Sequence, residues 1–191
     1  MSDLEAVLRA LPAFPDPLPV LSADDLPGDP HALFRSWLDA AVRSSAIASG
    51  ARQPHAMSFA TVRADGTPVA RTLILKDIDT DGYHFSTHRT SRKGMELAAC
   101  ARATMLFFWR ESGRQVRITG TAVALDDDAS QRDWRERPSY TGEPNPDWQR
   151  YALDPDEFEF MQAREDRRHT RIEYLRSDGG WAHAPVATPA G

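Results

Sequence analysis

The chain has 191 residues, of which 41% are hydrophobic and 27% charged, and its formal net charge is −5. This length and balance are typical of one globular domain and exclude a disordered chain. The negative net charge argues against a general nucleic-acid-binding protein, which needs a basic face. Any anion site must therefore be a local cluster of Lys and Arg.

Cys100 is the single cysteine, which excludes an intramolecular disulfide, so a reducing cytoplasm is the expected location. It follows an apolar run at the end of a predicted helix, and we expect it to be buried and structural. The N-terminus shows no basic region followed by a long apolar run, so no signal peptide is expected. No apolar stretch approaches the ~18 residues that a membrane span needs, so a membrane is not an expected partner.

The first part of the chain predicts an arm followed by a helix. Residues 1–30 are rich in Pro, Asp and Leu without a sustained period, which predicts a flexible N-terminal arm. Residues 31–191 are expected to form a single domain. Asp29 and Pro30 mark a helix start, as cap and first helical residue. Apolar residues then recur at helical spacing to about residue 48.

From residue 56 the apolar residues alternate, which predicts strands. The expected strands are 57–62, 69–78, 83–87, 104–109, 115–125, 157–162 and 171–176. Two helices are expected among them, at 91–99 with Ser91 as cap and at 126–137 with an acidic first turn. Tight turns without long crossover helices indicate antiparallel pairing. The predicted fold is mainly β (α+β), an antiparallel barrel with a few flanking helices.

Basic residues gather where the predicted structure is most regular. Arg71 and Lys76 fall on the strand at 69–78, and Arg92 and Lys93 open the helix at 91–99. A helix start presents unpaired N–H groups, so two cations and the Ser91 hydroxyl there favour a phosphate dianion. The alternative is that these are ordinary solvated surface charges.

Several short motifs resemble, in order and spacing, the flavin-binding motifs of the pyridoxamine 5′-phosphate oxidase family. They are Arg71-Thr72-Leu73-Ile74-Leu75-Lys76, Phe85-Ser86-Thr87-His88, Ser91-Arg92-Lys93-Gly94, Arg114-Gln115-Val116, Arg137-Pro138, Met161-Gln162 and Arg167-Arg168-His169-Thr170-Arg171. The resemblance covers most of residues 31–183. The Phe-Ser-Thr-His motif is also similar to the phenazine-biosynthesis oxidase branch.

The resemblance implies a split β-barrel homodimer with flavin mononucleotide (FMN) at the subunit interface. The positions that it assigns to FMN are Arg71, Thr72, Leu73, Ile74, Leu75, Lys76, Ser86, Thr87, Arg92, Lys93, Gln115, Met161 and Arg171. The positions that it assigns to a small-molecule substrate are Lys76, Asp133, Arg137, Thr141, Arg167 and His169, of which Arg167 and His169 are the catalytic candidates.

The implied reaction is hydride transfer from the substrate's aminomethyl carbon to flavin N5. Oxygen then reoxidises the flavin and yields hydrogen peroxide, and water hydrolyses the imine to the aldehyde. The flavin carries out the difficult step, while the protein positions it and supplies charge.

Three features depart from the family pattern. Asp133 stands where the family has a tyrosine that contacts substrate, and Met161 stands where it has a tryptophan against the flavin. Only nine residues separate Pro138 from Trp148, where the family has a longer segment. A carboxylate close to a substrate phosphate would repel it by about 1 kcal/mol or more.

Three functions therefore stay open. The first is a flavin oxidase acting on pyridoxamine or pyridoxine 5′-phosphate. The second is a flavin oxidoreductase acting on another metabolite, such as an aromatic intermediate of phenazine type. The third is a flavin-binding protein without turnover.

Other chemistries have weaker support. His84 and His88 are four residues apart and should face the same side, but no third ligand is in register, so no metal is expected. No serine lies in a nucleophile-elbow sequence, which argues against a hydrolase. No Gly-x-Gly-x-x-Gly follows a predicted strand, which argues against a dinucleotide site.

Overall fold

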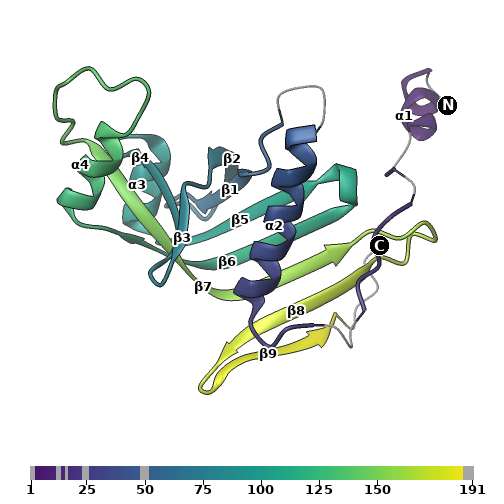
Figure 1. Cartoon of the computed structure of the whole chain (residues 1–191). Helices are drawn as coiled ribbons and strands as arrows, with labels where there is room; N and C mark the ends of the chain where they lie inside the picture. Colours follow the sequence, from purple (N-terminus) through teal and green to yellow (C-terminus); the bar gives the residue numbers. More distant parts are fainter. Residues whose placement is uncertain (1–2, 12–13, 16, 23–25, 48–51, 187–191) are drawn as a thin grey trace.

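The computed structural model describes residues 3–11, 14–15, 17–22, 26–47 and 52–186 (Figure 1). The helices are α1 (Asp3–Ala10), α2 (Pro30–Ile47), α3 (Arg92–Ala99) and α4 (Asp127–Arg135), with a short 3-10 helix at Arg110–Ser112. The strands are β1 (Ala56–Val62), β2 (Pro68–Ile74), β3 (Asp77–Asp79), β4 (Gly82–His88), β5 (Arg102–Trp109), β6 (Arg114–Ala124), β7 (Trp148–Gln162), β8 (Thr170–Ser177) and β9 (Gly180–Pro185).

The strands of the described residues form one antiparallel sheet that closes on itself. Its order is β2-β1-β5-β6-β7-β4-β3, and β8 and β9 continue from β7. The two ends of this order, β2 and β3, are joined by only Leu75 and Lys76. The Leu75 N–H donates to the carbonyl of His55 and the Lys76 N–H to that of His84, both at 2.9 Å. The chain thus crosses from the β1 edge to the β4 edge, and the predicted antiparallel split barrel is confirmed.

The core fills the barrel and the space beneath α2, which Figure 1 shows lying across the middle strands. On β5, β6 and β7 alternate side chains point inward and are buried, among them Met105, Phe107, Ile118, Phe158 and Phe160. From α2, the Phe34 ring packs edge-on against Phe107 at 5.0 Å, and Trp37 packs against Phe160 at 5.4 Å. This apolar packing fixes α2 on the sheet.

The predicted helix starts are confirmed by their caps. An Asp29 carboxylate oxygen accepts from the His31 N–H at 2.9 Å at the start of α2. The Ser91 hydroxyl accepts from the Gly94 N–H at the start of α3, and Asp126 accepts from the Ala129 N–H before α4. Each side chain satisfies a helix donor that has no partner within the helix.

Two strand predictions were wrong. The strand expected at 69–78 is divided into β2 and β3, because the chain changes its pairing partner at Leu75 and Lys76. The strand expected at 157–162 is only the end of β7, which begins at Trp148. β7 pairs with β6 along its length, with β4 over its first part and with β8 over its last part. It is buried on both faces and therefore lacks the alternation that reveals a half-exposed strand.

The structure adds detail for the N-terminal arm, and one smaller expectation, the burial of Cys100, differs from it. The N-terminal arm, in which no period was found, contains α1. Farther along it, Leu21 and Leu26 pack against the core, and the Tyr174 hydroxyl donates to the Pro27 carbonyl at 2.9 Å. Cys100 is half-buried at the end of α3 rather than buried. Among the described residues, no helix is both long enough and apolar enough to span a membrane.

Candidate functional site

The start of α3 forms one wall of a basic groove. The groove has a volume of about 330 Å³, and its charged lining residues are Arg63, Arg71, Arg92, Lys93 and Glu96. Four cations thus face one carboxylate in a protein whose net charge is negative. Partial burial, and then the neighbouring Arg71, lower the pKa of the Lys93 ammonium. The groove therefore holds more positive charge than its own carboxylate offsets, which favours an anion.

Glu96 holds Arg71 in this groove. Its Oε2 accepts from an Arg71 guanidinium nitrogen at 2.7 Å and also from the Thr61 hydroxyl. Arg71 donates in turn to the Thr61 hydroxyl oxygen. The hydrogen bond from Thr61, opposed by burial and assisted by Arg71, lowers the pKa of Glu96, so this carboxyl is ionised at neutral pH. Glu96 and Thr61 were not among the predicted site residues, because Glu96 lies 25 residues from Arg71 in the sequence and Thr61 joins the site only through that pair.

The start of α3 is packed directly on the end of β4. A Cβ added at Gly94 would lie 2.4 Å from the Arg89 carbonyl oxygen, so no larger residue fits there without a shift. The Ser91 hydroxyl donates to the His88 carbonyl at 2.7 Å and lies 3.1 Å from the Thr87 hydroxyl. The motifs at residues 85–88 and 91–94 therefore form one unit, in which the Ser86 hydroxyl is buried.

A second group of predicted FMN residues forms a row across the outer face of the sheet. Gln115 on β6 is opposite Met161 on β7, which is opposite Arg171 on β8. An Arg171 guanidinium nitrogen donates to Glu159 at 2.7 Å, while its Nε is buried without a hydrogen-bond partner. Glu159 also lies 3.2 Å from Arg117.

The two catalytic candidates follow this row in the β7–β8 turn. Arg167 is exposed and has a φ of 61°, the left-handed region that larger residues seldom adopt. His169 accepts a hydrogen bond at Nδ1 from the Arg164 N–H at 3.1 Å. In the neutral ring the proton therefore lies on Nε2, which is the nitrogen available as a donor.

The remaining substrate candidates gather beside Trp148. Asp133 is only 4% exposed, and both of its carboxylate oxygens accept from Lys76 Nζ at 2.7 Å. The Trp148 indole N–H donates to the same carboxylate at 2.7 Å. Burial alone would raise the pKa of Asp133, but the hydrogen bonds from Lys76 and Trp148 outweigh it and lower the pKa. The Arg137 guanidinium carbon stacks 4.3 Å from the Trp148 ring centre.

The structure therefore brings the predicted residues into groups rather than into one site. Ser86 is opposite Arg150 near the start of β7, whereas Arg171 is opposite Met161 near its end. These positions are eleven residues apart, or roughly 35 Å along an extended strand. Thr141 is exposed in the loop between α4 and β7. His84 and His88, the two histidines spaced four residues apart, make separate contacts. His84 forms hydrogen bonds with Asp79 and Arg150, and His88 packs edge-on against Trp148.

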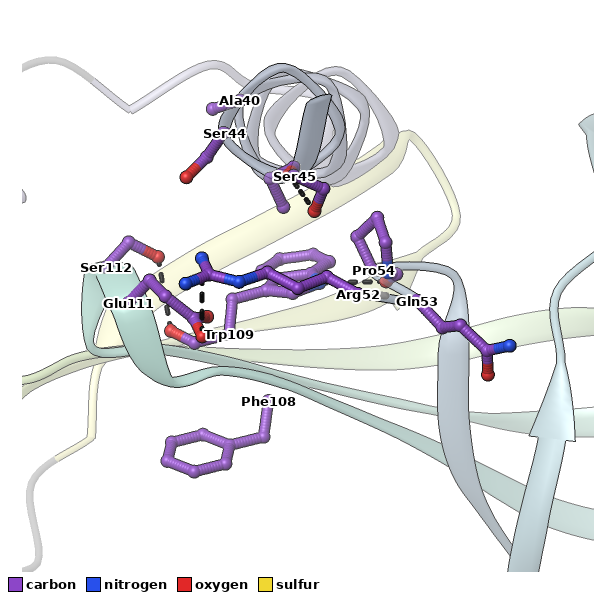
Figure 2. A pocket seen from close by; sticks show the side chains of 11 residues that line it. Ala40, Ser44, Ser45, Arg52, Gln53, Pro54, Phe108, Trp109, Glu111 and Ser112 are labelled. Carbon is purple, nitrogen blue, oxygen red and sulfur yellow. Dashed lines mark hydrogen bonds and ion pairs between the residues drawn. The ribbon is translucent and has the colours of Figure 1, made fainter. Parts of the chain in front are cut away.

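A separate pocket of about 260 Å³ lies between α2 and the end of β5 (Figure 2). Arg52 and Glu111 form an ion pair of 3.4 Å at this pocket, and the rings of Phe108 and Trp109 line it. None of the residues predicted from the motifs lines this pocket. The predicted site residues therefore lie elsewhere on the barrel.

Comparison with known proteins identifies the family. Residues 44–171 match the family model described as pyridoxamine 5′-phosphate oxidase. This chain belongs to that family. The predicted resemblance is confirmed, and membership places the protein among oxidoreductase enzymes.

Individual relatives agree with this assignment. A pyridoxine/pyridoxamine 5′-phosphate oxidase of Cupriavidus pinatubonensis is 36% identical over 84% of this chain and 90% of the relative. One from Pseudomonas paraeruginosa is 35% identical over 87% and 92%. PhzG from Burkholderia lata, solved with tetrahydrophenazine-1-carboxylic acid, is 30% identical with a TM-score of 0.78, over 88% of this chain and 98% of that chain. An FMN-binding protein of Nostoc punctiforme, at 20% identity and a TM-score of 0.67, shares the fold.

Proposed function

We propose that this protein is an FMN-dependent oxidase that acts as a homodimer, with each FMN bound between the two subunits. The main support for this proposal is the distance along β7 between the two groups of residues predicted to bind FMN. An FMN that contacts Ser86 is far too short to reach Arg171 of the same chain. In a symmetric dimer, two complementary half-sites on each chain combine into two complete sites.

The phosphate end of FMN fits the basic groove. Arg92 and Lys93 open α3, whose unpaired N–H groups and positive dipole end favour a dianion. Arg71 reaches the same groove from β2 and is held there by Glu96. These three cations on two elements are a typical arrangement for a phosphate ester.

The flavin ring fits two polar atoms that lack partners in the described chain. Ser86 Oγ and Arg171 Nε are the buried side-chain atoms there without a hydrogen-bond partner, and both belong to residues predicted to bind FMN. Buried polar groups are rarely left unpaired, so a ligand with polar edges accounts for both. The outer face beside Arg171 also exposes Phe108 (52%) and Leu175 (46%), which a second subunit would cover.

When bound, FMN supplies a hydride acceptor at N5 that oxygen can reoxidise. The chain itself holds the cofactor and orients the substrate. In each site, one subunit supplies the basic groove for the FMN phosphate. The other subunit supplies Arg167 and His169, which contact the substrate. His169 donates from Nε2, since its Nδ1 is occupied by the Arg164 N–H. The Trp148 ring packs against the Lys76–Asp133 pair and donates its indole N–H to Asp133.

Purified protein tests the proposal directly. We expect a yellow protein that absorbs at about 450 nm and holds one FMN per chain. Oxygen consumption with pyridoxamine 5′-phosphate would show that this protein oxidises that compound. Flavin reduction by other amines or reduced aromatic acids alone would point to another metabolite. A protein that takes up no added FMN would contradict the proposal.

The second candidate, oxidation of another metabolite, is favoured by the Lys76–Asp133 pair. A lysine expected to meet a substrate phosphate is already neutralised by a buried carboxylate.

A further inference from the structure

Beside Trp148, the charges of Lys76 and Asp133 offset each other. We call Lys76, Asp133, Arg137 and Trp148 the Asp133 cluster. Lys76 is engaged at both carboxylate oxygens of Asp133, and its side chain keeps only 28% exposure. An oppositely charged group at 2.7 Å removes most of the field that a lysine presents to an approaching anion. Lys76 is therefore a weak partner for a further anion.

Arg137 supplies the positive charge that remains. Its guanidinium lies over Trp148 at 4.3 Å and over Trp134 at 4.9 Å. None of the ion pairs among the described residues involves Arg137. Stacking between rings holds a guanidinium in place and leaves its N–H edge free for a carboxylate. The Asp133 cluster therefore offers about one uncompensated positive charge.

We propose that the Asp133 cluster selects a substrate with a single negative charge, a carboxylate, and rejects a phosphate dianion. The inference rests on the proposed function, since it places the substrate at this cluster. A monoanion can pair with Arg137 and lose little to Asp133. A dianion feels twice the attraction of Arg137 and twice the repulsion of Asp133, which is buried, but its desolvation penalty grows roughly with the square of its charge, and a single guanidinium does not offset it.

A purely structural role is the competing explanation. Asp133 is on α4, Lys76 follows β2 and Trp148 opens β7, so the cluster also fixes α4 to the barrel. In that case a change at Asp133 would lower stability and leave the preference among anions unchanged. The preference between two matched anions is therefore the informative readout.

Benzoate and phenyl phosphate are suitable probes, because they share a ring and differ in charge. Their dissociation constants are measured with the FMN-loaded protein at pH 8 from the change in flavin absorbance. We expect the wild-type protein to bind benzoate at least about tenfold more tightly than phenyl phosphate. Tighter binding of phenyl phosphate by the wild-type protein would overturn the proposal without any variant.

Asp133→Asn removes the charge and keeps an acceptor for the Trp148 indole. Phenyl phosphate should then bind roughly tenfold more tightly and benzoate about threefold, as their charges of two and one require. Asp128→Asn, an exposed change on the same helix, should alter neither constant. An unchanged ratio in an Asp133→Asn protein that still holds FMN would overturn the inference alone. Failure of the wild-type protein to bind FMN would instead overturn the proposed function.

Discussion

Replacement of both Arg92 and Lys93 with alanine is expected to weaken FMN binding by more than about tenfold. Each cation opens α3 and lines the basic groove, and a charge-assisted hydrogen bond to phosphate contributes about 1–3 kcal/mol. Together they account for roughly 2–6 kcal/mol, which raises Kd at least about thirtyfold. Fluorescence titration of the FMN-free protein measures this loss.

The fold should survive this double change, because Arg92 is exposed and Lys93 half-exposed. Arg43→Ala is a matched control that removes one exposed charge from α2, far from the groove. Its Kd for FMN should equal that of the wild-type protein. An unchanged Kd in the Arg92→Ala/Lys93→Ala protein would refute the placement of the phosphate.

Glu96→Ala is expected to lower the free energy of unfolding by about 2 kcal/mol at pH 7. The change leaves Arg71 and Thr61 without their shared acceptor in a covered position. Arg71 keeps some exposure and can regain water, so the loss is smaller than for a fully buried pair. Glu96→Gln, which keeps an acceptor, should lose less. Urea denaturation measures both differences.

The stability difference between the wild-type and Glu96→Ala proteins should depend on pH. The pKa of Glu96 is lowered from its ordinary value of 4.5, so its contribution to stability is complete above that value. The contribution disappears as the pH falls through the lower pKa of the folded state. The wild-type and Glu96→Ala proteins should therefore converge in stability in acid. A constant difference down to about pH 3 would show that the ion pair is not its source. Glu165→Ala, at an exposed site, serves as the control.

Local signals in the sequence predicted most elements of the fold. Asp29, Ser91 and Asp126 each marked a helix start, and alternation marked the strands that are covered on one face. The division at Leu75 could not be predicted, because it depends on which distant strand the chain meets next. The first part of β7 was not predicted, because Pro155 breaks the strand pattern in the sequence beside a shift in register at Gly120 and because both faces of the strand are covered.

The candidate site also has a part that local sequence predicts and a part that it does not. The Ser91-Arg92-Lys93 cluster is contiguous, so its geometry could be predicted from helix physics. The pairing of Glu96 with Arg71 could not, since spacing on the helix alone would favour Arg92 as its partner. The Lys76–Asp133 pair joins residues 57 positions apart, and only the folded barrel reveals that the two charges cancel.

The central claim is that each FMN is held by residues of two subunits, and hybrid dimers test it most directly. One variant carries Arg92→Ala and Lys93→Ala, the other Gln115→Ala and Arg171→Ala, and neither alone should bind FMN. Co-expressed in equal amounts, they should form mixed dimers in which one of the two sites combines both intact halves. We expect recovery of about one FMN per four chains in the mixture. No recovery, in mixtures shown to contain mixed dimers, would contradict a site shared between subunits.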